Sequence, residues 1–147
     1  MGSLLGQHIS NFFLDKLFLL QKKALRIVFN LHPRAHTDAL FFEHKILKLK
    51  DLHSFQLGQF MFKYNNNHLP KIFHDSFHRN SHVHKYPTRR SNEFHLPLLR
   101  TVRAQNTFVY TGPRLWNNLD NCLKESPKFI TFKYKLRKHL LSTYITR

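Results

Sequence analysis

Acidic residues are scarce in this chain. Its 147 residues include eight Asp and Glu against 24 Lys and Arg, which gives a net charge of +16 before any histidine is protonated. Charge repulsion of this size opposes a compact state, and a polyanionic partner relieves it. The composition therefore favours a nucleic acid as partner, ahead of an anionic membrane surface. A basic surface without a dedicated ligand is the alternative.

Cysteine and long apolar runs are also nearly missing. Cys122 is the only cysteine, which excludes an internal disulfide and a cysteine-rich zinc site and fits a reducing compartment. No uninterrupted apolar run approaches the roughly 18 residues of a membrane span. The first residues lack the basic start and long apolar stretch of a signal peptide. We therefore expect an intracellular protein, nuclear or cytoplasmic, without a membrane span.

Glycine and proline occur four and six times, too rarely for a low-complexity linker. Phenylalanine occurs 15 times, and its rings bring enough apolar area for a core. We expect one folded domain.

Apolar residues near the start of the chain recur at steps of three and four, which predicts a helix over residues 15–30. The stripe expected to be buried consists of Leu14, Leu17, Gln21, Ala24, Leu25 and Val28. Pro33 should end this segment, since it biases the preceding residue away from helical angles.

Further helices are predicted at residues 39–44, from Asp51 to Tyr64, at residues 71–77, and in the last segment, which carries Phe132, Leu136 and Leu140. Residues 79–92 form a long basic loop, and residues 93–96 and 106–110 are short candidate strands. Gly112 and Pro113 indicate a turn that opens a helical turn carrying Trp116. The predicted fold is mainly α: a small helical domain with a long basic loop and room for a short β-hairpin.

Cations on both terminal helices are candidates for phosphate binding. Lysine contacts phosphate as a point charge and arginine as a two-pronged donor, and both need a rigid scaffold. The candidates are Lys22, Lys23 and Arg26 on the first helix and Lys133, Lys135, Arg137 and Lys138 on the last. A solvated polar face is the alternative reading.

The basic loop offers a second nucleic-acid candidate. Tyr86 could stack a base while Arg89 and Arg90 grip phosphates. A passive, disordered loop explains the same composition equally well.

The sequence does not contain a complete pattern of catalytic residues. His74 and His78 stand four residues apart, as in zinc proteases, but Asp75 is a poor substitute for their glutamate and no third ligand can be named. Polymerase chemistry needs paired acidic metal ligands, whereas the acidic residues here are scattered. We expect no catalytic residue, no metal and no cofactor.

Several short segments, taken in order, resemble one family. The nine segments are Leu14–Leu17, Gln21–Ile27, Arg34–Asp38, Leu47–Leu52, Phe60–Tyr64, Leu69–Pro70, Tyr86–Arg89, Gly112–Asn117 and Phe132–Leu136. In this order they resemble the carboxy-terminal, post-palm tail of reverse transcriptases from non-LTR (LINE-type, jockey/CR1-like) retrotransposons. The resemblance covers nearly everything from Leu14 to Leu141. It predicts a single helical domain over residues 14–147 and leaves residues 1–13 as an unmatched extension.

The resemblance implies a thumb-like part of an RNA-directed DNA polymerase that helps to hold template RNA and the primer duplex. Gln21, Lys22, Lys23 and Arg26 would face nucleic acid or the palm of the parent enzyme, and Arg89 would belong to the loop signature. Trp116 would belong to a packed turn. Because the palm and its metal-binding aspartates are missing, this chain would not polymerise nucleotides. The expected partners are RNA or DNA, bound without strong sequence preference and sensitively to salt.

Three other readings stay open. The chain could be a protein-interaction fragment with exposed apolar patches, a basic amphipathic module on anionic membranes, or a relic reading frame without selected activity.

Overall fold

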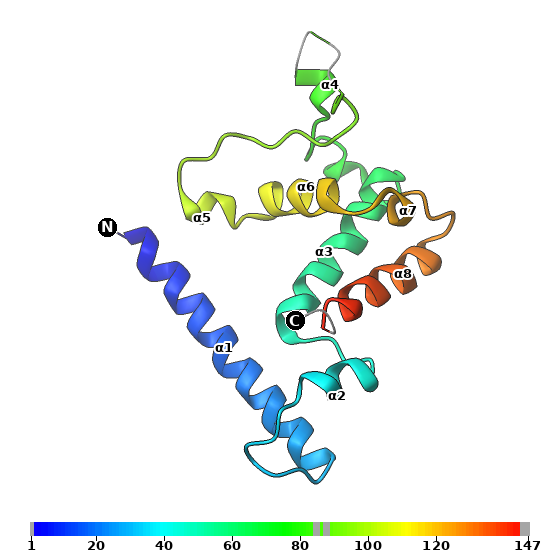
Figure 1. Ribbon diagram of the computed structural model, residues 1–147. Coiled ribbons are helices and arrows are strands. Elements are labelled where there is room, and N and C mark those ends of the chain that lie inside the picture. Colours follow the sequence, from blue (N-terminus) through cyan, green and yellow to red (C-terminus); the bar gives the residue numbers. More distant parts are fainter. Residues whose placement is uncertain (1, 84–85, 87–88, 145–147) are drawn as a thin grey trace. The chain divides into compact units, whose positions relative to one another are not determined.

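The computed structural model describes residues 2–83, 86 and 89–144, with side chains from residue 13 onward. It is mainly helical, which confirms the predicted fold class (Figure 1). The helices are α1 (Gly2–Val28), α2 (Asp38–Glu43), α3 (Leu49–Asn65), α4 (Asn80–Val83), α5 (Val102–Gln105), α6 (Phe108–Asn118), α7 (Asn121–Lys124) and α8 (Phe129–Ser142), with a 3-10 turn η1 at Lys71–Phe73.

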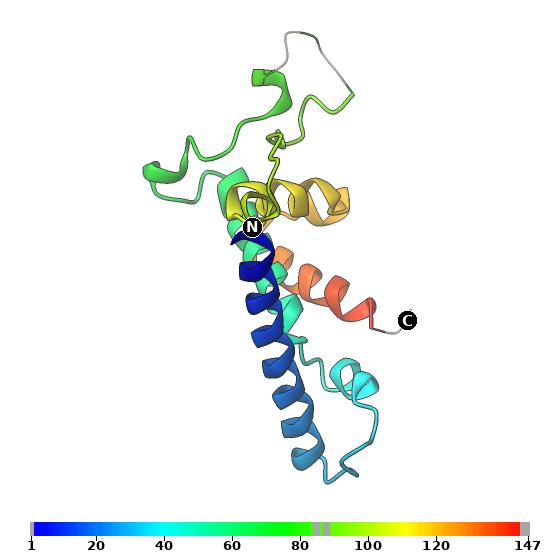
Figure 2. The ribbon, with the colours of Figure 1, turned by 90° about the vertical axis from the view of Figure 1, so that its left-hand side faces the viewer.

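The chain forms two compact units. Unit 1 comprises residues 1–55 and 133–147, and unit 2 comprises residues 56–132. Helix α1 belongs to unit 1 and continues through residue 13 without a break (Figure 2). The predicted single domain over residues 14–147, with an unmatched extension before it, stays a prediction.

Aromatic side chains set the orientation of α1 within unit 1. Phe18 stacks on the buried Phe41 of α2, with ring centroids 6.0 Å apart. Leu25 is buried, and Phe29 stacks on His44 at 4.0 Å. Phe18, Leu25 and Phe29 are seven and four residues apart, so they lie on one side of the helix.

The buried stripe predicted for α1 is therefore partly wrong. Leu25 is buried as expected, whereas Leu14, Leu17 and Val28 are exposed. Phenylalanine rings bury more area than leucine side chains, so Phe18 and Phe29 decide which side packs. The helix ends at Val28 because Asn30 adopts a left-handed φ of 49°, before Pro33 can act.

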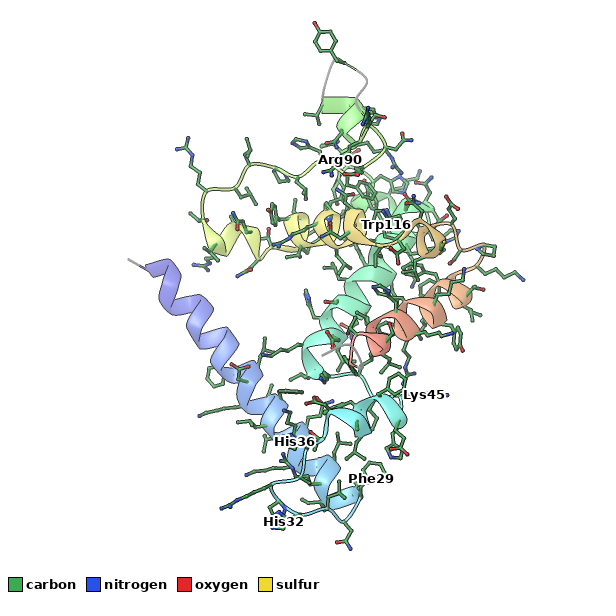
Figure 3. The ribbon with its side chains drawn as sticks, in the orientation of Figure 1. Phe29, His32, His36, Lys45, Arg90 and Trp116 are labelled. Carbon is green, nitrogen blue, oxygen red and sulfur yellow. The ribbon has the colours of Figure 1, made fainter. Side chains whose placement is uncertain are left out.

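Unit 2 is built around stacked aromatic rings. Phe62 of α3 stacks on Phe132 at 4.4 Å, and both are almost completely buried. Trp116 of α6 lies 6.4 Å from Phe62 and 5.9 Å from Phe132. Trp116, among the dense side chains of α6 (Figure 3), is a core residue as predicted.

The predicted strand at residues 106–110 is wrong, and so is the turn at Gly112. Residues 108–118 form α6, and Pro113 lies inside it. The buried positions Gly112, Pro113, Trp116 and Leu119 have helical spacing, which outweighs the short alternation of Phe108 and Tyr110.

Gly112 lets α6 approach α3 closely. A Cβ at this position would lie 2.9 Å from Met61 Sδ, closer than carbon and sulfur normally pack. A larger residue there would push against a fully buried side chain.

The segment between η1 and α5 differs from the prediction in two places. The helix predicted over residues 71–77 is reduced to η1. Within the described residues, the strand predicted at 93–96 is a single antiparallel bridge between Phe94 and Arg79. The predicted β-hairpin is therefore wrong, because its second strand is helical.

Candidate nucleic-acid interface

The three cations predicted on α1 have different environments. Arg26 Nε donates a hydrogen bond to the Ala35 carbonyl at 2.9 Å, so it supports the loop that follows the helix. Lys22 Nζ lies 4.6 Å from the centre of the Phe18 ring and is half-buried. Lys23 is exposed. Of the three, Lys23 is the most accessible to a phosphate.

Gln21 has an internal role. Its Nε2 donates to the Leu47 carbonyl at 2.9 Å, and its Oε1 accepts the Leu49 amide at 3.0 Å. Both polar groups of the side chain therefore bind the backbone at the start of α3. Because both groups are engaged inside the protein, this geometry does not favour the contact with nucleic acid or palm that the resemblance implies for Gln21.

A cavity of about 380 Å³ in unit 1 gathers several lysines. The lining residues are Phe18, Lys22, Asp38, Lys48, Lys50, Asp51, Thr143 and Tyr144. Lys48 Nζ pairs with Asp38 at 2.8 Å, and Lys50 Nζ pairs with Asp15 at 2.8 Å. The ion pair with Lys48 holds the pKa of the Asp38 carboxyl below its usual value. Two of the three lysines are thus already partnered, so this cavity is a weak anion site.

Tyr144 fastens the end of the chain to the start of α3. Its hydroxyl donates to Asp51 and accepts the Lys48 amide at 3.0 Å. Burial raises the pKa of the Tyr144 hydroxyl, and the bond to Asp51 raises it further. The sequence gives no signal for this link, because local periodicity cannot pair residues so far apart. Asp51, predicted as the first residue of this helix, accepts the hydrogen bond from Tyr144.

Helix α8 displays the densest group of candidate cations. Lys133, Lys135, Arg137 and Lys138 are all exposed, and the helix from Phe129 to Ser142 contains no acidic residue. Arg137 Nη2 donates to the carbonyl of Lys45 at 2.7 Å (Lys45 is labelled in Figure 3). The other three cations, Lys133, Lys135 and Lys138, project from a regular helix, in which residues three and four apart are neighbours on the surface. Such an array suits phosphate contact.

The basic loop of unit 2 is closed at its base. Beside the Arg79–Phe94 bridge, the Asn80 amide donates to the Glu93 carbonyl at 3.0 Å and the Ser81 amide to the Ser91 carbonyl at 3.0 Å. Residues 80–83 form α4, so the predicted loop is partly helical. His84, Lys85, Pro87 and Thr88 lie outside the described residues.

The predicted loop residues are presented to solvent. Tyr86 is 82% exposed, and Arg89 is exposed. The side chain of Arg90, which is labelled in Figure 3, is exposed too. Its Nε lies 3.7 Å from Glu93 Oε1. An exposed ion pair of this length contributes little, so Arg90 stays accessible to a phosphate.

Arg79, which was not predicted as a site residue, lies in a second cavity. Its Cζ is 5.0 Å from the centre of the Phe94 ring, Nη2 donates to Asn65 Oδ1 at 2.8 Å, and Nη1 donates to the Asn92 carbonyl. The cavity measures about 340 Å³. It is lined by Tyr64, Asn65, Asn67, Leu69, His74, Asp75, Phe77, His78, Arg79, His82 and Phe94.

The zinc-protease spacing of His74 and His78 is not realised on a helix. Helical turn η1 ends at Phe73, so the two imidazoles do not share a helical face. Across the described part of the chain, no three His, Cys, Asp or Glu side chains gather closely enough to hold a metal ion. Likewise, none of the described helices has the length and apolar character needed to cross a bilayer.

Comparison of the chain with models of protein families, with curated proteins and with solved structures gives no match.

Proposed function

We propose that this protein binds the sugar-phosphate backbone of RNA or DNA without strong sequence preference. The observation that carries the proposal is the exposed cationic surface of α8, which has no acidic neighbour within the helix. Lys23 of α1 and Arg89 and Arg90 of the basic loop add to it. Phosphate contacts of this kind act through charge and release bound counterions.

The charge balance supports this proposal. In the sequence of unit 1, 13 Lys and Arg stand against four Asp and Glu, and in unit 2, 11 stand against four. Two of the acids in unit 1, Asp15 and Asp38, already pair with lysines. The large excess of cations therefore cannot be neutralised internally, and a polyanion would neutralise it.

We further propose that the chain is the post-palm, carboxy-terminal part of a non-LTR retrotransposon reverse transcriptase, and that it is not catalytic alone. The ordered segments that resemble this family support the assignment. Within one of these segments, Gly112–Asn117, Gly112 lies close to Met61 and Trp116 is buried, which fits the packed turn that the resemblance implies. The palm of such a parent enzyme is then a partner.

Salt titration tests the electrostatic proposal. Binding of fluorescein-labelled 20-nucleotide RNA and DNA is measured by anisotropy between 50 and 200 mM salt. Six to ten phosphate contacts should weaken the affinity about 10³- to 10⁵-fold over this range. An affinity that does not change with salt would contradict the proposal.

A pair of matched double variants locates the surface. Lys133→Gln with Lys138→Gln removes two exposed cations of α8, while Lys71→Gln with Arg100→Gln removes two exposed cations elsewhere. For a single strand, the first pair should flatten the slope of log affinity against log salt by about 1.4, at about 0.7 per contact. Equal slopes for the two pairs would show that α8 is not the contact surface.

The absence of polymerase activity is tested separately. Purified protein on a primed template with Mg²⁺ and nucleotides should extend no primer. Primer extension that survives removal of contaminating polymerases would overturn the non-catalytic assignment.

Protein interaction is the second candidate function, favoured by apolar residues exposed on α1. Leu17 is 51% exposed, and Ile27 and Val28 are 79% and 74% exposed. Contiguous exposed apolar residues are typical of association surfaces, and Ile27 and Val28 are adjacent. Gel filtration with light scattering, run with and without nucleic acid, distinguishes protein interaction from nucleic-acid binding. If association with a partner or with a second copy persists in the Ile27→Gln/Val28→Gln variant, it does not involve this surface.

A further inference from the structure

We propose that the cavity beside Arg79 receives one unpaired nucleobase of a single-stranded nucleic acid. The cavity lies in unit 2, at the base of the loop that presents Arg89 and Arg90. Its volume of about 340 Å³ is within the range of small-ligand sites. The inference rests on the proposed function, since it names the part of the nucleic acid that this unit recognises.

Arg79 provides the stacking surface. Its guanidinium is held over the Phe94 ring at 5.0 Å and is anchored by hydrogen bonds to Asn65 Oδ1 and the Asn92 carbonyl. Phe94 itself is buried, so the ring and guanidinium form a fixed, half-buried pair. Arg79 also lines the cavity, so a base that enters the cavity can stack on the part of the guanidinium plane that Phe94 leaves uncovered. Arginine planes and aromatic rings are the usual platforms for unpaired bases.

The remaining lining suits the edge of a base better than a free phosphate. Donors and acceptors are mixed: Asn67, His74, His78 and His82 stand beside the carboxylate of Asp75. A carboxylate repels phosphate but accepts a hydrogen bond from the amino group of a base. Apolar side chains, Leu69 and Phe77, complete the lining, as expected for a planar, partly apolar ligand.

The backbone around the cavity is held in place. The Tyr64 hydroxyl oxygen lies 2.7 Å from the His74 carbonyl oxygen and 2.8 Å from that of Phe77, so its one O–H is shared between these two acceptors. The Phe77 amide donates to the same hydroxyl oxygen at 3.3 Å. On the other side, the His95 amide donates to the His78 carbonyl at 2.8 Å. A site whose walls are fixed before binding loses less entropy on binding.

The test compares intact and base-free strands. Anisotropy is measured with a labelled hexadeoxynucleotide and with a hexamer of the same length built entirely from abasic residues, which keeps every phosphate. We expect the intact strand to bind about 5- to 150-fold more tightly, which corresponds to one stacked base at about 1–3 kcal/mol.

Arg79→Lys keeps the charge and removes the planar guanidinium. It should abolish most of the preference for the intact strand while leaving abasic binding and the salt slope unchanged. Arg100→Lys, at an exposed position of unit 2 outside the cavity lining, is the matched control and should keep the preference. Circular dichroism and Trp116 fluorescence establish that both variants are folded.

A mapping experiment on the unaltered protein avoids any dependence on folding of the variants. A hexamer of 4-thiouridine, cross-linked by light and analysed by mass spectrometry, should attach to residues lining the cavity, with Tyr64, His78 and His82 the expected targets. Equal affinity for intact and abasic strands, or cross-links confined to other residues, overturns the inference. If both strands bind in a salt-dependent way without discrimination, the proposed function stands and the base site does not. If neither strand binds in dilute buffer, the proposed function fails as well.

Discussion

Replacing Gly112 by alanine probes how closely α6 and α3 pack in unit 2. The added Cβ would lie 2.9 Å from Met61 Sδ and 3.6 Å from Met61 Cγ. Met61 is completely buried, so it cannot swing into solvent and has to repack. Overpacking of this kind costs about 1–3 kcal/mol. Alanine is also about 1 kcal/mol better than glycine inside a helix, so the net loss of unfolding free energy should be about 0–2 kcal/mol.

A double-mutant cycle separates these two effects. Met61→Val removes the δ-position sulfur that the new Cβ would meet, so Gly112→Ala in this background should gain the helical preference without the clash. The coupling free energy between the two substitutions should then be about 1–3 kcal/mol, because Met61→Val relieves the clash that Gly112→Ala introduces. Met61→Val alone costs free energy through lost packing, which the cycle subtracts.

Urea unfolding gives the required measurement. Trp116 is the only tryptophan and is 5% exposed in unit 2, so its emission should shift to longer wavelength when the unit unfolds. Helical circular dichroism, followed on the same samples, reports the whole chain. A Gly112→Ala variant that is more stable than the parent, with no coupling to Met61→Val, would refute the close approach of the two helices.

Three further predictions concern unit 1. Tyr144→Phe removes the hydroxyl bound to Asp51 and to the Lys48 amide, and should lower the free energy of unfolding by about 1.5 kcal/mol, measured by denaturation followed by circular dichroism. Because the folded state raises the pKa of Tyr144, its contribution is complete below pH 10 and is lost as the pH rises further, so the stability difference between parent and Tyr144→Phe should shrink in alkali. The pKa of Asp38 is lowered in the folded state, so the stability that this residue contributes is present above pH 3.8 and is lost as the pH falls through its folded-state pKa. The difference in unfolding free energy between the parent and Asp38→Asn should therefore vanish in strong acid. A difference that grows there would contradict the ion pair with Lys48.

Helical periodicity predicted the longer helices because their own residues carry the signal. In α8, Phe132 and Leu136 are four residues apart and both are buried, as the pattern indicated. Helix α3 begins two residues before the predicted Asp51 and ends at the asparagine run. Trp116, beside Pro113 and Leu115, was expected to anchor a packed helical turn, and its burial confirms this.

Short segments were predicted less well because two patterns fit them. Phe108 and Tyr110 alternate as in a strand, but the residues that follow continue a helix whose buried positions lie further along. On α1, two stripes of apolar residues compete. The packed one is chosen by Phe41 and His44, which stack on Phe18 and Phe29 from outside the helix.

The amino-acid sequence by itself determined the helical class, the excess of cations and the exposed basic surface of α8, since charge and periodicity are properties of neighbouring residues. Tertiary structure decided which cations are accessible and which are engaged. It paired Lys48 with Asp38, bound Arg26 to the Ala35 carbonyl and placed Arg79 over Phe94. These contacts join residues from separate segments, and only the folded backbone brings such segments within hydrogen-bonding distance.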